Sequence, residues 1–272
     1  MKKIKLHYLV GNVHLGGHDI QRVAKNNRLM LEKAGCFDVL MVSYNPELAD
    51  ITFGCYFDGK YMEECEVFVF DCGGIPYFNE KEGQERFERV ISAGAGCVFL
   101  HGTQVCYWKD VGMAAWDEME KMAGLLWRNS TQHGDYSDTH VTIWKREHPI
   151  MQGMTDFDTT DELFCRCENV YQVPLEVLAT AYSDPEVISR HGLRGTGKEE
   201  PIAVTGMYGK GRIFNQFLGH VWPYYTGHGL GENTMLSFQP VQFRQMFVRA
   251  CEWAATGKVE RTLDFDGKVK LV

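Results

Sequence analysis

The chain has 272 residues, of which 44% are hydrophobic and 24% charged, so it can bury the core of one large α/β domain without disulfides. Its formal net charge is −8, and no basic cluster follows Met1–Lys3, which argues against nucleic acid or an anionic membrane surface as a partner. No apolar run approaches the roughly 20 residues of a membrane helix, and the first residues lack a signal-peptide core. We therefore expect a cytoplasmic protein whose nine cysteines are reduced thiols.

The first half of the chain alternates short apolar runs with helical segments. Buried strands are predicted at residues 4–10, 37–43, 67–74 and 97–100. Asp19 is expected to cap a helix over residues 20–34, which Gly35 ends. An Asn-x-x-Glu capping box, Asn79 to Glu82, opens another helix that reaches about residue 93. This rhythm predicts a mostly parallel sheet with helices on both faces.

The second half is less regular. A helix is expected over residues 116–127, with Gly124 in its interior, and a closing helix over 240–255. Further strands are expected at 139–144, at 175–182 and, on either side of a tight turn at Tyr208–Gly211, within 201–220. Residues 189–200 are polar and glycine-rich, as in an exposed loop. We predict a single domain over residues 1–258, followed by a C-terminal tail, 259–272.

In an open parallel sheet, ligands bind beyond the carboxyl ends of the strands. Polar and aromatic side chains gather in the loops expected there. The candidates are His14, His18, Asp19, Asp71, His101, Thr103, Tyr107, Trp108, His133, Asp135, Asp161, Glu162 and His220. Each has an ordinary structural alternative, because a histidine after a strand often only binds a nearby carbonyl. Trp222 and Tyr224 lie beside His220, and exposed aromatic rings among polar groups suit a sugar.

The fourth strand runs into "CVFLHGTQ", where α/β hydrolytic folds place an exposed serine or cysteine. This stretch resembles the Cys-His-Gly elbow of the PfpI-type peptidases and, more loosely, that of class I glutamine amidotransferases. Leu100 stands at the position of their cysteine. Because leucine cannot attack a carbonyl, Cys-dependent amidotransfer is not expected.

Several further stretches, together with this elbow, resemble the ThuA-like (trehalose-utilisation) family. They are "VFVFDC", "FLHGT", the segment from Gly124 to His133, "HPIMQGM" with "FDTTDELF", "VLAT", "PIAVTGMYGKGRIFNQFLGH" and "VRACEWAATGK", and they span roughly residues 4–258. The resemblance implies a three-layer α/β fold of the flavodoxin-like and glutamine-amidotransferase-like type that lacks the cysteine nucleophile. It also implies a cytoplasmic protein of carbohydrate use, with a disaccharide, a glycoside or a 3-keto derivative as substrate.

Our first hypothesis is an enzyme that acts on such a sugar by acid/base chemistry, because a ketone acidifies the neighbouring C–H bond. His101 would be a base or a ligand, and Asp161 or Glu162 a second acid/base. His18, His133 and His220 could hold a zinc or manganese ion. Substrate contacts are expected from Asp19, Thr103, Tyr107, Trp108, Trp222 and Tyr224. No nucleotide cofactor is expected.

Two alternatives stay open at this point. The protein could bind or sense a sugar without turning it over, which the leucine at the elbow favours. It could also be a hydrolase that uses Cys106 or Thr103 as nucleophile, which requires that residue to lie near a histidine. Exposed aromatic residues could equally form the interface of a homo-oligomer.

Overall fold

The computed structural model describes residues 2–11, 18–71, 81–113, 115–189, 192–221 and 235–272. The strands are β1 (Ile4–Val10), β2 (Phe37–Ser43), β3 (Val67–Asp71), β4 (Gly96–Leu100), β5 (Gln132–His133), β6 (Ser137–Ile143), β7 (Phe157–Asp161), β8 (Phe164–Cys165), β9 (Leu175–Tyr182), β10 (Glu199–Tyr208) and β11 (Gly211–Gln216). The helices are α1 (Ile20–Ala34), α2 (Phe53–Asp58), α3 (Lys81–Ala93), α4 (Asp117–Ala123) and α5 (Val241–Thr256). Short 3-10 helices are η1 (Met62–Glu64), η2 (His101–Val105), η3 (Lys109–Val111) and η4 (Leu236–Phe238).

Nine strands form one sheet in the order β2-β1-β3-β4-β11-β10-β9-β6-β7, and β5 pairs with β8 in a small second sheet. The first five strands of this order are mutually parallel, and the pairs from β11 to β7 are antiparallel. In the described chain, β6 and β10 run against the other seven strands of the sheet. The predicted α/β class with a mostly parallel central sheet is therefore confirmed.

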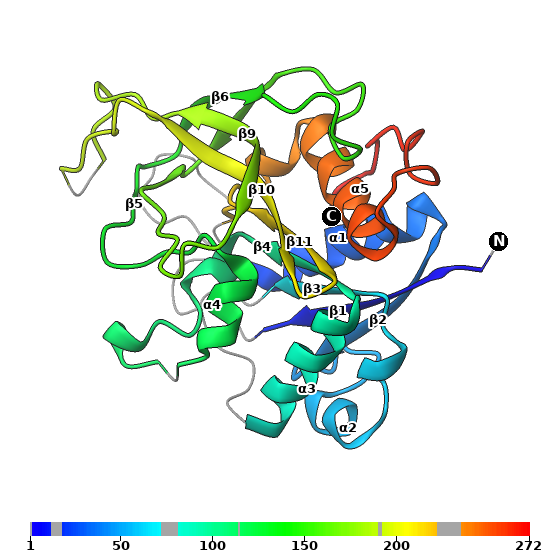
Figure 1. Cartoon of the computed structure of the whole chain (residues 1–272). Coiled ribbons are helices and arrows are strands. Elements are labelled where there is room, and N and C mark those ends of the chain that lie inside the picture. The colour runs from blue at the N-terminus through cyan, green and yellow to red at the C-terminus, as the bar shows by residue number, and fades with distance from the viewer. Residues whose placement is uncertain (1, 12–17, 72–80, 114, 190–191, 222–234) are drawn as a thin grey trace.

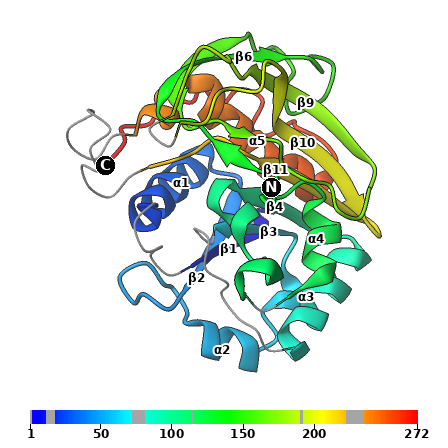
Figure 2. The ribbon, with the colours of Figure 1, turned by 90° about the vertical axis from the view of Figure 1, so that its left-hand side faces the viewer.

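Helices cover both faces of the parallel block, because alternate residues of its strands point to opposite sides. Tyr8 on β1 and Val98 on β4 pack in a core cluster with side chains of α1 and α5. Their neighbours Leu9 and Phe99 pack in a second cluster with side chains of α2, α3 and α4. Figures 1 and 2 show the sheet between these two sets of helices.

Strand direction determines where the site can form. β1, β3, β4, β11 and β7 all run the same way, so their carboxyl ends lie at one edge of the sheet. Asp71 ends β3, His101 follows β4 and Asp161 ends β7 at this edge. The segment before β6, which contains His133, reaches the same edge because β6 runs in the opposite direction.

Two expectations about the elements need correction or restriction. The helix expected over residues 116–127 ends at Ala123, because Gly124 adopts a left-handed φ of 72° and closes α4. An added Cβ at Gly124 would also lie 2.8 Å from side-chain atoms of Leu175 and Val173. The capping box that begins at Asn79 starts outside the described residues, and α3 is described from Lys81.

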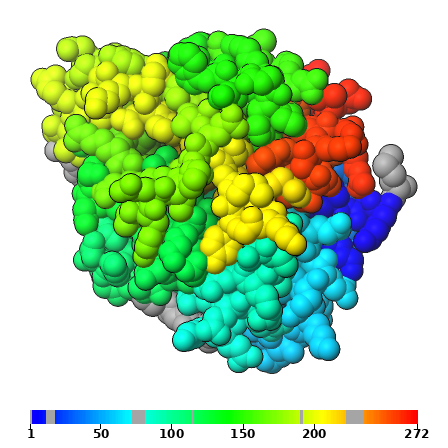
Figure 3. Space-filling view, viewed as in Figure 1, coloured from blue at the N-terminus to red at the C-terminus, as the bar shows by residue number. Residues whose placement is uncertain are grey.

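The C-terminal segment packs closely on the domain. The Glu252 carboxylate of α5 accepts hydrogen bonds from the backbone N–H groups of Arg261 and Thr262, at 2.9 and 2.8 Å. Val272 N donates to Asn26 Oδ1 of α1 at 2.9 Å. Figure 3 shows the segment, in red, against α5 in orange at the surface. In the described part of the chain, no helix is long and apolar enough to cross a membrane.

Candidate functional site

Three imidazole rings meet at the carboxyl edge of the sheet. His18 lies just before α1, His101 follows β4 directly, and His220 lies four residues after β11. The ring centroids of His18 and His220 are 4.4 Å apart in a stacked arrangement, and each is 5.0 Å from that of His101. We call His18, His101 and His220 the histidine cluster.

His101 is held in one orientation as a neutral ring. Its Nδ1 lies 2.6 Å from the carbonyl oxygen of Phe217, and because a carbonyl only accepts, Nδ1 must carry the proton. Its Nε2 is buried, with no hydrogen-bond partner among the described residues. Burial, and then the nearby His220, hold the pKa of His101 well below its usual range.

His101 is also the strained residue of the turn, with a φ of 27°, whereas Leu100 keeps an extended φ of −110°. Backbone strain of this kind is concentrated at functional sites. The strained position of the elbow thus belongs to the histidine.

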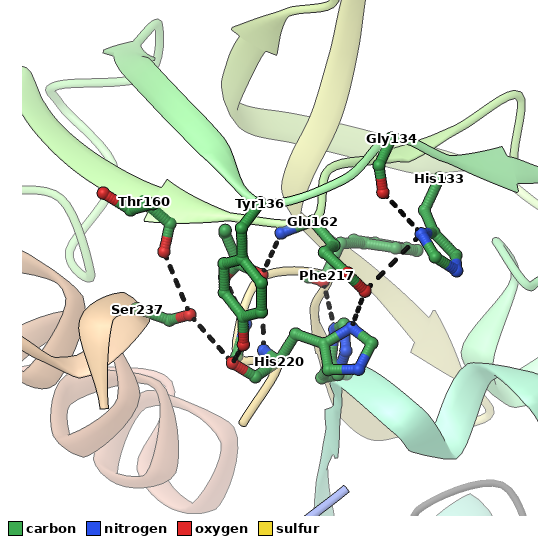
Figure 4. A network of polar contacts seen from close by, with 11 residues as sticks. His133, Gly134, Tyr136, Thr160, Glu162, Phe217, His220 and Ser237 are labelled. Atoms are coloured by element: carbon green, nitrogen blue, oxygen red, sulfur yellow. Dashed lines mark hydrogen bonds and ion pairs between the residues drawn. The ribbon is translucent and has the colours of Figure 1, made fainter. Parts of the chain in front are cut away.

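A buried carboxylate joins two histidines from different parts of the chain. Glu162, which is 0% exposed, places Oε2 2.8 Å from Nδ1 of His220 and 3.5 Å from Nδ1 of His133. Nδ1 of His133 also lies 2.6 Å from the carbonyl oxygen of Gly134. Figure 4 shows Glu162 between the two rings. This arrangement leaves the Nε2 atom of each ring to meet a ligand.

The neighbouring Asp161 holds the backbone of the site. Its carboxylate accepts hydrogen bonds from the backbone N–H groups of Glu162 at 2.7 Å, Gly219 at 2.8 Å and His220 at 3.3 Å. Burial raises the pKa of Asp161 to about 6 in spite of these donors. Gly219 needs its glycine here, because its φ is 136° and an added Cβ would lie 3.4 Å from Cβ of His101. Asp161 is therefore a positioning residue in this structure.

Further hydrogen bonds fix the His220 carbonyl. Tyr136, just before β6, donates its hydroxyl proton to this oxygen, and Ser237 of η4 donates to it at 3.2 Å. Both contacts appear in Figure 4. Three separate segments, those of Asp161, Tyr136 and Ser237, thus hold the backbone on which His220 stands, which keeps its ring in place.

Asp71 at the end of β3 lies in the same pocket as the cluster. Tyr8 donates its hydroxyl proton to Asp71 Oδ2 at 2.6 Å, and Asn27 donates to the Tyr8 hydroxyl at 2.7 Å. Burial raises the pKa of the Asp71 carboxyl to about 7. The pocket is lined by His18, Ile20, Val23, Asn27, Asp71, Leu100, His101, Gly102, Gln216, Leu218, Gly219, Phe238, Phe243 and Phe247. A carboxyl group in this setting can hold a proton near neutral pH.

The residues expected to contact substrate are placed differently. Asp19 caps α1 by accepting from Arg22 N at 3.1 Å, and Thr103 donates its hydroxyl proton to the Phe70 carbonyl at 2.8 Å. Tyr107 lies buried against Trp116 in the core, and Trp108 is half-buried. None of these four lines the pocket at the histidine cluster. Trp222 and Tyr224, like His14, lie outside the described residues.

The expected metal ligands were His18, His133 and His220, and the structure brings a different group of three histidines together. It groups His101 with His18 and His220, while His133 stands beside Glu162. His133 is among the candidates from the sequence, but its position beside Glu162 depends on the two-residue pairing of β5 with β8. Of the alternative nucleophiles, Thr103 binds a backbone carbonyl and Cys106 is buried in the core cluster with α3 and α4.

A second pocket is lined in part by His133. Its polar and aromatic lining includes Ser137, Asp138, Tyr182 and Arg194. Tyr182 is 52% exposed, at the end of β9 and so at the same edge of the sheet. His133 is thus accessible from a surface with hydrogen-bonding groups and an exposed ring.

The sequence profile of the ThuA family, described as trehalose utilisation, matches residues 9–254. A ThuA-like protein from Parabacteroides merdae is 25% identical, with a TM-score of 0.72 over 95% of this chain and 92% of that one. A ThuA-like protein from Bacteroides uniformis is 15% identical, with a TM-score of 0.63 over 96% of each chain.

A cytoplasmic protein from Salmonella typhimurium LT2 is 12% identical, with a TM-score of 0.51 over 92% of this chain and 99% of that one. The Bacteroides uniformis and Salmonella structures show a shared fold alone. No curated protein matches the sequence. Because the profile covers nearly the whole length, the chain belongs to the ThuA family, described as trehalose utilisation.

Proposed function

We propose that this protein acts on a disaccharide, a glycoside or a 3-keto derivative of one, by acid/base chemistry without a covalent nucleophile. One observation carries the proposal: a fully buried carboxylate, Glu162, pairs with His133 and His220 next to a neutral His101. The family's description, trehalose utilisation, supports a carbohydrate as the substrate class. Leucine at position 100 is consistent with chemistry that needs no thiol.

His133 is the group that we assign as base. Its Nδ1 faces Gly134 O and Glu162, so Nε2 carries the lone pair, and its side chain is 23% exposed. Glu162 is itself inaccessible and acts through the ring, by stabilising the imidazolium that forms. In a 3-keto sugar, Nε2 would take the proton from the carbon next to the ketone. The C–H electron pair would then move toward the ketone and form an enolate.

Asp71 is our candidate acid. When the enolate electrons return, they can expel the glycosidic oxygen from the adjacent carbon, and that oxygen needs a proton. Since its pKa is raised to about 7, Asp71 retains a proton at neutral pH and can supply it. The proton removed by His133 and the one given by Asp71 balance, so the sugar is cleaved by elimination without an oxidant.

The pocket beside His133 is our candidate sugar site. Tyr182 offers a ring face for the C–H side of a sugar, and Ser137, Asp138 and Arg194 offer hydrogen bonds to hydroxyl groups. We also propose kinship with the glutamine-amidotransferase-like, three-layer fold, which the helices on both sheet faces support. We propose a cytoplasmic location as well, supported by the eight described cysteines, which are free thiols.

The test is to incubate the protein in D2O with trehalose and with its chemically oxidised 3-keto derivative, and to follow both by NMR. We expect the keto sugar alone to lose its proton next to the ketone and to release glucose. His133→Asn should slow both events by about 100-fold or more. His140→Asn is the matched control, because His140 also pairs with a carboxylate but on the exposed face of β6.

If neither sugar changes while one of them binds tightly, the protein is a sugar-binding or regulatory protein and the enzymatic proposal is wrong. If the unoxidised disaccharide is cleaved as fast as the keto sugar, the assignment of a ketone-dependent step is wrong.

A further inference from the structure

We infer that His18, His101 and His220 bind a divalent transition-metal ion, with zinc as the best match to the ligand set. The ion's binding stands on the geometry of the three side chains. Its role in catalysis, as an acid that polarises the substrate oxygen, rests on the function proposed above.

The distances between the three rings fit such an ion after a small movement. One ligand nitrogen from each histidine lies within 4.8 Å of the other two. Two imidazole nitrogens on a tetrahedral zinc, each about 2.0–2.1 Å from it, are about 3.4 Å apart. Each pair therefore has to close by at most about 1.4 Å. Rotation of a histidine side chain about its own bonds can supply this, and no rearrangement of the sheet is needed.

His101 presents a lone pair that needs a cation. Because Nδ1 donates to the Phe217 carbonyl, Nε2 has no proton and can only accept. Nε2 is buried and has no partner among the described residues. A buried acceptor without a donor is costly, so it points to a ligand. A metal ion satisfies it directly.

His220 repeats the same arrangement with a carboxylate. Its Nδ1 lies 2.8 Å from Oε2 of Glu162, and a proton on Nδ1, facing this carboxylate, leaves the lone pair on Nε2. Metal-binding histidines commonly use their second nitrogen in this way, toward a carboxylate or a backbone carbonyl. In this cluster, His220 faces a carboxylate with its second nitrogen, and His101 faces a backbone carbonyl.

A hydrogen-bonded trio of histidines cannot replace the ion. A neutral imidazole has one N–H, and those of His101 and His220 point away from the cluster. His18 could turn a single N–H inward and satisfy one of the two lone pairs. One N–H bonds to one nitrogen at a time, whereas one cation can meet the lone pairs of all three rings.

The ligand number suggests what the ion does. Among the described residues, the group of possible ligands consists of these three histidines. Three protein ligands with an open fourth position are typical of catalytic zinc sites, whereas structural sites are closed by four. His18 and His101 line the same pocket as Asp71, so a substrate in this pocket would lie beside the ion. A substrate ketone oxygen bound there would be polarised, which would acidify the neighbouring C–H bond.

The test is metal content, measured without any substrate. Protein purified without an affinity tag or chelator, and chelator-stripped protein reloaded with zinc, should each hold about one zinc per chain. His18→Ala, His101→Ala and His220→Ala should lower zinc affinity at least about 100-fold. Glu162→Gln should weaken it about 10- to 100-fold, because it removes the charge behind His220. Cobalt reloaded in place of zinc should give the visible absorption of a tetrahedral site.

His133→Ala and His140→Ala are the controls, and both should keep full zinc affinity. Because His18 is only partly buried, its alanine variant is the least expected of the three to disturb folding. Circular dichroism checks the fold of each variant. The inference is wrong if stripped wild-type protein takes up neither zinc, cobalt nor manganese. It is also wrong if His133→Ala loses zinc while His101→Ala keeps it. Zinc bound without turnover of any sugar would overturn the proposed function and leave the metal site standing.

Discussion

The two halves of the nine-stranded sheet contribute different kinds of groups to the site. The central strands of the parallel block are buried on both faces: every residue of β3 and β4 is buried, and their polar groups come where these strands end, at Asp71 and His101. The antiparallel part alternates between buried and exposed positions, so polar residues lie along the whole of its strands. Asp158 and Asp161 both belong to β7, yet the side chain of Asp158 is 85% exposed and Asp161 is fully buried.

This difference separates two tasks within one site. The parallel block supplies His101 and Asp71, whose pKa values burial shifts toward the neutral form. The antiparallel part supplies Glu162, whose buried oxygen pairs with two histidines. Burial shifts Asp161 of β7 in the same direction, to a pKa of about 6, so buried titratable groups from both halves meet where the halves join. Pairs of titratable groups in contrasting environments are a common basis for acid/base catalysis.

The largest effect is expected from Glu162→Gln, which keeps the shape of the side chain and removes its charge. We expect turnover of the keto sugar to fall about 100- to 10,000-fold, because the imidazolium of His133 loses its counterion. Steady-state kinetics of Glu162→Gln and of Asp158→Asn, the exposed carboxylate of the same region, make the comparison. Equal rates in the two variants would show that burial of the carboxylate is irrelevant to the chemistry.

Asp161→Ala should make the folded protein less stable. The substitution removes the acceptor of three backbone N–H groups, those of Glu162, Gly219 and His220, in a fully buried place. We expect the free energy of unfolding to fall by about 3 kcal/mol, measured with urea. Asp161→Asn keeps one acceptor oxygen and should lose less. A loss below about 1 kcal/mol for the alanine variant would contradict the positioning role.

Asp71→Asn tests the buried carboxyl group of the parallel block, through the pH dependence of the free energy of unfolding. The Asp71 pKa is about 7 in the folded chain against an ordinary 3.8, so the folded state binds the proton more tightly. The stability that this carboxyl contributes is complete below about pH 4 and is lost as the pH rises through about 7. The stability difference between wild type and Asp71→Asn should therefore shift by about 3 kcal/mol against the wild type from pH 5 to pH 8.

Urea unfolding of both proteins at four pH values measures this shift. Asp161, whose pKa is also raised by burial, is present in both proteins, so its contribution cancels in the difference. A difference that stays constant with pH would mean that Asp71 titrates in its ordinary range and is no acid at pH 7.

Sequence patterns predict the parallel half closely because its rules are local. The run Ile4–Val10 is a strand, Asp19 caps α1 and Gly35 ends it with a φ of 74°, as expected. The rule that ligands bind beyond the carboxyl ends of parallel strands also predicts His101 and Asp71 as site residues. These predictions hold because burial on both faces forces a continuous apolar run, and the first polar residue after it lies at the edge.

The antiparallel half and the details of the site depend on distant contacts. His133 reaches Glu162 only because two residues of β5 pair with β8, which is too short a pairing for sequence patterns to reveal. Tyr107 and Thr103 follow His101 closely, yet the chain turns them into the core, with Tyr107 at a φ of 57°. Gly124 ends a helix that hydrophobic periodicity alone would extend to Trp127.

The smallest effect is expected at the exposed histidine–carboxylate pair of the antiparallel part. Nδ1 of His140 lies 2.7 Å from Asp158 Oδ1, a shorter contact than that between His133 and Glu162, but both side chains are mostly exposed. Solvent screens such a pair, so a double-mutant cycle of His140→Ala and Asp158→Asn should give a coupling of less than about 1 kcal/mol. The equivalent cycle of His133→Ala and Glu162→Gln should give a larger value, because Glu162 has no access to water. If the exposed pair couples as strongly as the buried one, distance and not burial sets the strength of these pairs, and the contrast between Glu162 and Asp158 would lose its basis.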